Sequence, residues 1–173
     1  MRERRIEDVD TLKALAHPLR LEALGELRAH GPATASELAR ALGESSGSLS
    51  YHLRQLERYG FVTDDASRDS RERRWRAVHE TTSLPSSLRD TDEGHAAMNV
   101  VAGVQRSHLL AQLEAAESNP TALFDQSDYR LRLDRAELDD LLRDLHEVVG
   151  RYADHGGEHE MALHLVAVRP TPR

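Results

Sequence analysis

Residues 34–59 contain two short helical patterns separated by a glycine, and this arrangement restricts the fold of the chain more than any other feature. The hydroxyl of Thr34, followed three residues later by a glutamate, predicts a capping box at the start of the first helix. The second pattern covers residues 45–59 and has leucines on one face and polar residues elsewhere. Its apolar face consists of Leu49, Leu53 and Leu56. A short helix, a glycine turn and a helix with a polar outer face predict a helix-turn-helix.

The flanking segments extend this helix-turn-helix into a small domain. Helical periodicity covers residues 7–16 and 18–29, which are separate helices because a proline is tolerated at a helix start but breaks a helix interior. Residues 61–63 and 73–78 are rich in β-forming residues and enclose a turn-prone loop, so they predict a hairpin. Residues 1–80 are therefore predicted to form a winged helix-turn-helix domain, in which the hairpin is the wing.

The second half of the chain has a different organisation. Residues 81–94 are rich in serine and threonine around a proline, and this composition predicts a linker. Residues 95–173 are predicted to form a helical region that dimerises and is a candidate for effector binding. A long helix is expected over residues 95–117. A strongly amphipathic helix is expected over residues 134–153, where an aspartate and a glutamate three residues later form a second capping box.

Two further segments of this region alternate apolar and polar residues with the period of a strand. Residues 129–133 and residues 161–168 show this alternation, and we expect the two strands to pair with each other. The predicted fold class is therefore mainly α with a small β content. It combines a winged helix-turn-helix domain with a C-terminal α+β region for dimerisation and sensing.

The net charge of −7 opposes DNA binding only until it is divided along the chain. Residues 1–80 contain 14 basic and 14 acidic residues, so the excess acidity lies in residues 81–173. Residues 46–76 contain seven arginines and five acidic residues, and this is the locally basic segment of the chain. It is a candidate surface for contact with phosphates.

The composition also excludes several classes of function. The absence of cysteine excludes disulfides, thiolate metal sites and cysteine nucleophiles. No apolar stretch approaches the roughly 18 residues that a membrane-spanning helix needs, and residues 1–5 lead into acidic residues and not into the apolar core of a signal peptide, so we expect a cytoplasmic protein. The chain has no phosphate-binding glycine loop, no nucleophile elbow and no zinc-protease motif. We therefore expect neither catalysis nor a cofactor.

Two segments of the first domain resemble a known family. Residues 12–24, Leu-Lys-Ala-Leu-Ala-His-Pro-Leu-Arg-Leu-Glu-Ala-Leu, resemble the opening of ArsR-like winged-helix repressors. Residues 48–56, Ser-Leu-Ser-Tyr-His-Leu-Arg-Gln-Leu, followed by Gly-Phe-Val at 60–62, resemble their recognition helix and the entry into the wing. The resemblance covers roughly residues 8–79. The C-terminal region is similar in pattern to members of this family that dimerise through a helical extension.

The resemblance implies a homodimer that places one recognition helix per subunit in successive major grooves of a palindromic operator. It also implies repression that a small organic effector releases, although no residue identifies that molecule. By position, the residues expected to face bases or backbone are Ser46, Gly47, Ser48, Ser50, Tyr51 and His52. The arginines expected to meet phosphates are Arg54, Arg71, Arg73 and Arg74. The chemistry of these residues agrees with the contacts that the resemblance implies, because hydroxyls can form hydrogen bonds with base edges and arginine contacts to phosphate supply affinity.

Two alternatives remain open beside this interpretation. The first domain could be a winged-helix module that binds other proteins and does not bind double-stranded DNA. The chain could also be a metal-responsive repressor, because neutral imidazole is a common metal ligand. No tight ligand motif is present, so no residue is assigned to a metal. The residues that raise this alternative are Asp92, His95 and His108 on the long helix, and His155, Glu158, His159 and His164 near the C-terminus.

Overall fold

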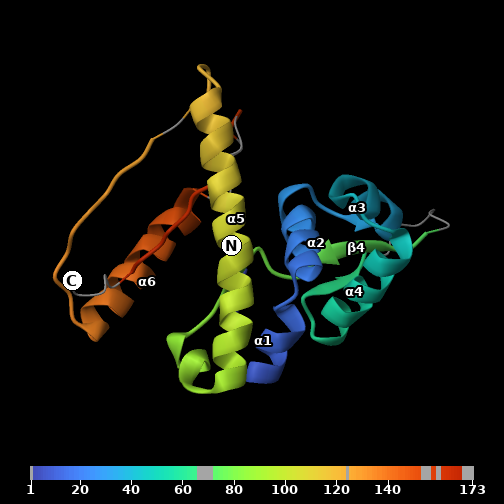
Figure 1. Cartoon of the computed structure of the whole chain (residues 1–173), viewed down its shortest axis with the longest axis horizontal. Coiled ribbons are helices and arrows are strands. Elements are labelled where there is room, and N and C mark those ends of the chain that lie inside the picture. The colour runs from blue at the N-terminus through green and yellow to red at the C-terminus, as the bar shows by residue number, and fades with distance from the viewer. Residues whose placement is uncertain (1, 66–71, 124, 153–156, 159–160, 169–173) are drawn as a thin grey trace. The chain divides into compact units, whose positions relative to one another are not determined.

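The computed structural model describes residues 2–65, 72–123, 125–152, 157–158 and 161–168. The chain divides into two compact units, Met1–His108 and Leu109–Arg173. Figure 1 shows the helices and strands of both units. The long helix α5 (Asp92–Ser118) begins in the first unit, and its residues up to His108 belong to that unit.

The first unit combines short helices with a small sheet. Before α5, its described α-helices are α1 (Val9–Leu15), α2 (Pro18–Ala29), α3 (Ala35–Leu42) and α4 (Ser46–Arg58). An antiparallel sheet has the strand order β2–β4–β3, with bounds Ala33–Thr34, Arg74–Ala77 and Val62–Asp64. These elements confirm the predicted winged helix-turn-helix: α3 and α4 are the two helices of the motif, and β3 and β4 are the strands of the wing.

The core of this unit forms where α4 packs against α2, α3 and the sheet. Leu49, Leu53 and Leu56 of α4 are fully buried, as the spacing of the leucines predicts. Phe61 and Trp75 of the wing join the same cluster and are 1% and 3% exposed. Burial of each such large side chain contributes roughly 1.5–3 kcal/mol to stability. The core therefore fixes which side of α4 faces the protein and which side faces solvent.

Local hydrogen bonds set the ends of α3 and α4. The Thr34 side chain accepts from the backbone N–H of Glu37 at 3.1 Å, and the Glu37 carboxylate accepts from the backbone N–H of Thr34 at 2.7 Å. This confirms the predicted capping box. Gly43 ends α3 with φ of 69°, in the left-handed region where a side chain is disfavoured. Ser45 then caps α4 by accepting from the backbone N–H of Ser48 at 3.1 Å.

A parallel pair of short strands flanks the wing and was not anticipated from the sequence. The strand β1 (Glu3–Arg5) pairs in parallel with β5 (Thr81–Ser83). The half-buried guanidinium of Arg28 donates to the backbone oxygen of His79 at 2.9 Å and to Thr82 Oγ1 at 2.7 Å, which ties α2 to this segment. Burial lowers the pKa of Arg28 to about 10. The segment expected to be a linker thus contains β5, a 3-10 helix (Ser86–Asp90) and the start of α5.

The described part of the second unit contains the end of α5 and the amphipathic helix α6 (Arg135–Tyr152). Reciprocal hydrogen bonds between Asp134 and Glu137, at 2.7 and 2.9 Å, form the second predicted capping box. None of the described residues of α6 is fully buried, although the helix carries a continuous apolar stripe. This stripe consists of Leu138, Leu141, Leu142, Leu145, Val148, Val149 and Tyr152.

The prediction of two strands in this region is wrong. Residues 129–133 and 161–168 are described, and neither segment forms a strand. Alternating apolar residues stabilise a strand only when a partner strand satisfies its backbone and a core covers one face. Here both apolar sets face solvent, as exposures of 78% for Tyr129 and 66% for Leu163 show. In the described residues of the single chain, the C-terminal region is therefore helical with extended segments.

Candidate nucleic-acid interface

The outer face of α4 is defined by its buried face. Because Leu49, Leu53 and Leu56 are fully buried and the helix has 3.6 residues per turn, the opposite side faces solvent. Tyr51 is 59% exposed, so its ring and its hydroxyl are accessible from solvent. The residues on this outer face are Gly47, Tyr51, Arg54 and Arg58. They combine a hydrogen-bonding ring, two cations and a glycine that leaves room for close approach.

Arg58 belongs to this face; the sequence placed it in the basic segment 46–76 but did not assign it an individual contact. It is exposed and lies one turn after Arg54 and two turns after Tyr51. The signal was present in the sequence, since residues spaced by four and seven share one helix face. The contact residues carried over by position from the family resemblance ended at Arg54 on this helix, so Arg58 received no individual role.

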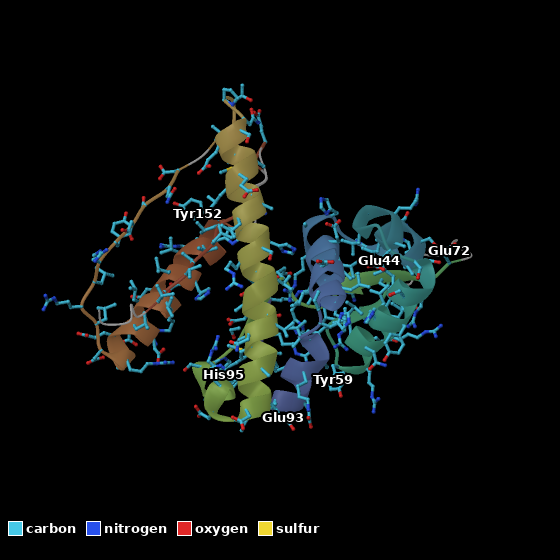
Figure 2. The ribbon with its side chains drawn as sticks, in the orientation of Figure 1. Glu44, Tyr59, Glu72, Glu93, His95 and Tyr152 are labelled. Carbon is cyan, nitrogen blue, oxygen red and sulfur yellow. The ribbon has the colours of Figure 1, made fainter. Side chains whose placement is uncertain are left out.

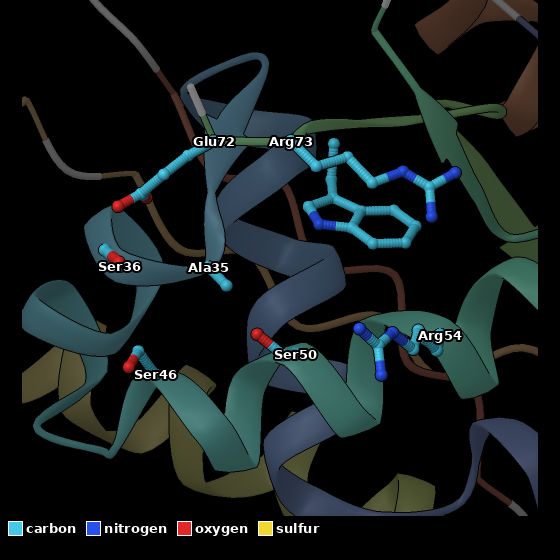
Figure 3. A pocket seen from close by; sticks show the side chains of 8 residues that line it. Ala35, Ser36, Ser46, Ser50, Arg54, Glu72 and Arg73 are labelled. Carbon is cyan, nitrogen blue, oxygen red and sulfur yellow. The ribbon is translucent and has the colours of Figure 1, made fainter. Parts of the chain in front are cut away.

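Ser46 and Ser50 lie on a different side of α4, next to a shallow hollow. With Arg54 they follow one another along the helix at intervals of four residues (Figure 3). Ser36 of α3 lines the same hollow, and Glu72, Arg73 and Trp75 complete its wall. The three hydroxyls and the Arg54 guanidinium can donate hydrogen bonds to an anion that enters from solvent. No hydrogen bond or ion pair is found for the Arg54 side chain among the described residues, so its donors remain available to a ligand.

His52 is not on the outer face. Its ring stacks against the ring of His17, which precedes α2, with centroids 4.3 Å apart and planes tilted by 37°. The Nδ1 atoms of both rings are buried and have no hydrogen-bond partner among the described residues. Burial lowers the pKa of both imidazoles, and the neighbouring Arg20 lowers them further. His52 therefore packs α4 against the α1–α2 corner and is turned away from a ligand at the outer face.

This histidine pair predicts a loss of stability in weak acid. Because the folded-state pKa of each ring lies below its ordinary value of about 6.5, the unfolded chain takes up protons first. The stability present above about pH 6.5 should therefore fall as the pH is lowered through that value, and the urea midpoint should be lower at about pH 5.5 than at about pH 7.5. The variant His52→Gln should show a weaker pH dependence than the control His95→Gln, which changes an exposed histidine of α5 (Figure 2). Equal pH dependence of the two variants would contradict this role of the pair.

Two of the expected phosphate-binding arginines are already engaged with carboxylates. Arg73 contacts both Glu57 and Asp64. Arg74 Nη1 lies 3.3 Å from Glu37 Oε2, and its Nη2 donates to the backbone oxygen of Pro32. Arg74 thus joins β4 to the capped start of α3. Arg71, the third expected wing arginine, lies outside the described residues.

A metal site gains no support from the described part of the chain. Within it, no group of three or more histidine, aspartate or glutamate side chains could hold a metal ion. His155 and His159 of the second candidate group lie outside the described residues. His164 is described, and its Nε2 shares a hydrogen bond of 2.5 Å with Gln112 Oε1 of α5. The metal-responsive alternative therefore remains an untested prediction.

No helix in the described residues is both long and apolar enough to cross a membrane. Residues 15–65, from the last residue of α1 to the residue after β3, match a family described as a helix-turn-helix domain. No curated protein matches the chain.

Several solved structures of bacterial regulators are similar to this chain. An ArsR family transcriptional regulator is 27% identical, with 64% of this chain and 91% of that chain covered and a TM-score of 0.33. A transcriptional regulator from Thermotoga maritima is 16% identical, with 79% and 76% covered and a TM-score of 0.35. A MarR family transcriptional regulator from Silicibacter pomeroyi is 20% identical, with 82% and 74% covered and a TM-score of 0.34.

Proposed function

We propose that this chain is a DNA-binding transcriptional regulator of the ArsR-like winged helix-turn-helix type, and that it represses transcription by binding a palindromic operator as a homodimer. Each subunit inserts α4 into a major groove with its outer face toward the base edges. The observation that carries this proposal is the geometry of α4: fully buried leucines on one side and the 59% exposed Tyr51 on the other. A helix held by one face against its own domain can present the opposite face to DNA.

The residues of α4 divide into two kinds of contact. Tyr51 on the outer face and the half-buried Ser48 beside that face offer hydroxyl groups that donate or accept hydrogen bonds, so they supply sequence preference at base edges. Ser46, Ser50 and Arg54 line the hollow beside α3, where a backbone phosphate of the DNA is the anion that fits their donors. Because Arg54 is the arginine of this set, it also supplies the salt-dependent part of the affinity.

The dimer is proposed on the apolar stripe of α6. A helix with an apolar stripe that its own chain does not fully cover needs a second surface, and a second copy of the chain offers the same stripe. Two recognition helices held about one helical turn of DNA apart would read a palindrome. An effector that binds better to a dimer with mis-spaced recognition helices would lower operator affinity by a shift in population. A protein that acts on the chromosome in this way would reside in the cytoplasm.

The contact assignment is tested by comparing variants on two duplexes, the region upstream of the protein's own gene and a scrambled duplex. Arg54→Ala should weaken binding to both duplexes and lower the slope of log K against log salt by about 0.9 per subunit. Tyr51→Ala should weaken binding to the first duplex by roughly 1–3 kcal/mol and leave binding to the second almost unchanged. The matched control Arg106→Ala removes an exposed arginine of α5 and should change neither. Equal losses on both duplexes for Tyr51→Ala, or an unchanged salt slope for Arg54→Ala, would refute these roles.

A further inference from the structure

We propose that Arg73 is a positioning residue that clamps the wing to the recognition helix α4, and that it does not contact phosphate. Its Nη2 donates to Glu57 Oε1 at 2.5 Å, its Nη1 donates to Glu57 Oε2 at 3.3 Å, and its Nε donates to Asp64 Oδ2 at 2.7 Å. Glu57 lies in the last turn of α4, Asp64 ends β3, and Arg73 immediately precedes β4. One guanidinium therefore joins the recognition helix to both strands of the wing.

The clamp also has an aromatic contact. The guanidinium carbon of Arg73 lies 4.1 Å from the centroid of the Trp75 ring, and this ring is part of the core at 3% exposure. In Figure 3 the side chain of Arg73 runs away from Ser36 and Ser46 and does not enter the space between them. All three nitrogens of the guanidinium thus carry hydrogen bonds while one of its faces covers the indole. A planar fork suits this arrangement, because an ammonium group has neither the fixed geometry nor the stacking face.

The charges argue against a direct role in DNA binding. Two carboxylates surround one guanidinium, so movement of Arg73 toward a phosphate would leave Glu57 and Asp64 unneutralised on the side of the domain that approaches DNA. Each partner is between about a third and a half exposed, and a single exposed pair of this kind contributes little to stability. Arg73 differs from such a single pair, because it makes a bidentate contact with Glu57 within a three-residue network. Several elements fix the geometry of this network at once.

The first test measures the contact between Arg73 and Trp75 in the full-length protein without DNA. Trp75 is the single tryptophan of the chain, so its fluorescence emission reports the environment of this ring alone. Arg73→Gln and Glu57→Gln should both shift the emission of Trp75, the second because Glu57 holds the guanidinium over the ring. Glu44→Gln, which removes an exposed carboxylate from the turn before α4, is the matched control and should leave the emission unchanged. An unchanged emission of Trp75 in Glu57→Gln would overturn the proposal that Arg73 clamps the wing to α4.

The second test rests on the proposed DNA binding. It distinguishes a role of Arg73 in positioning the wing from a direct contact of Arg73 with phosphate. If Arg73 positions the wing, Arg73→Lys and Arg73→Gln should both weaken binding to the upstream duplex by roughly three- to tenfold, with the salt slope of the wild type retained. If Arg73 contacts phosphate, Arg73→Lys should keep the wild-type affinity and Arg73→Gln should lower the slope by about 0.9 per subunit. The second result would overturn the proposal. Failure of the wild type to bind DNA would refute the proposed function, whereas the fluorescence test would still decide the clamp.

Discussion

Truncation of Leu53 to alanine should lower the free energy of unfolding by about 2–5 kcal/mol, which is much of the total stability of a small domain. Leu53 is fully buried at the centre of the face that α4 presents to its own domain. Its removal leaves a cavity that the surrounding helices can close only in part, so the lost transfer free energy and the cavity add together. Urea unfolding followed by circular dichroism would measure the change.

The matched control for this variant is Leu123→Ala, a leucine that is 63% exposed. Its truncation should change the free energy of unfolding by no more than about 0.5 kcal/mol. A similar effect of the two substitutions would show that Leu53 is not in the core. That result would also remove the basis for assigning the outer face of α4, because the outer face is defined as the side opposite the buried leucines.

Introduction of an aspartate at Leu145, the centre of the apolar stripe of α6, should convert the proposed homodimer into a monomer. A dimer interface that buries this stripe would also bury the new carboxylate without a partner, which is strongly unfavourable. Loss of the dimer removes the second recognition helix, so binding to a palindromic duplex should weaken by roughly 100-fold or more. Sedimentation analysis and a binding titration on the same sample would measure both effects.

The control for this variant is His146→Asp, which places a carboxylate on the exposed side of α6, beside the stripe. It should leave both the association state and the operator affinity close to those of the wild type. A Leu145→Asp protein that remains dimeric and binds as tightly as the wild type would exclude α6 as the dimer interface. A homodimer, as proposed, would then have to form through another surface of the chain.

The winged helix-turn-helix could be predicted from the sequence because its determinants are local. The capping box at Thr34 and the glycine after α3 act within a few residues, and the leucines of α4 follow one helical period. The capping box at Asp134 is local in the same sense, and α6 begins where it predicts. Such signals need no knowledge of the rest of the chain.

The features that could not be predicted depend on contacts between distant residues. The pairing of β1 with β5 joins segments almost 80 residues apart, and neither strand has an apolar alternation that would reveal it. The engagement of Arg73 with Glu57 likewise depends on how the wing folds onto α4. The opposite error arose at residues 129–133, where a clear alternation has no partner strand within the described chain. Periodicity indicates that a segment could form a strand, and the tertiary structure decides whether a partner strand is there to pair with it.

The most direct test of the central claim, that the outer face of α4 binds double-stranded DNA, is the salt dependence of binding. Fluorescence anisotropy of a labelled upstream duplex would be measured with the full-length protein at several salt concentrations. We expect log K to fall linearly and steeply with log salt, and we expect the slope of Arg54→Ala to be smaller than that of the wild type. The absence of binding even at low salt, or equal slopes for the wild type and Arg54→Ala, would contradict this claim.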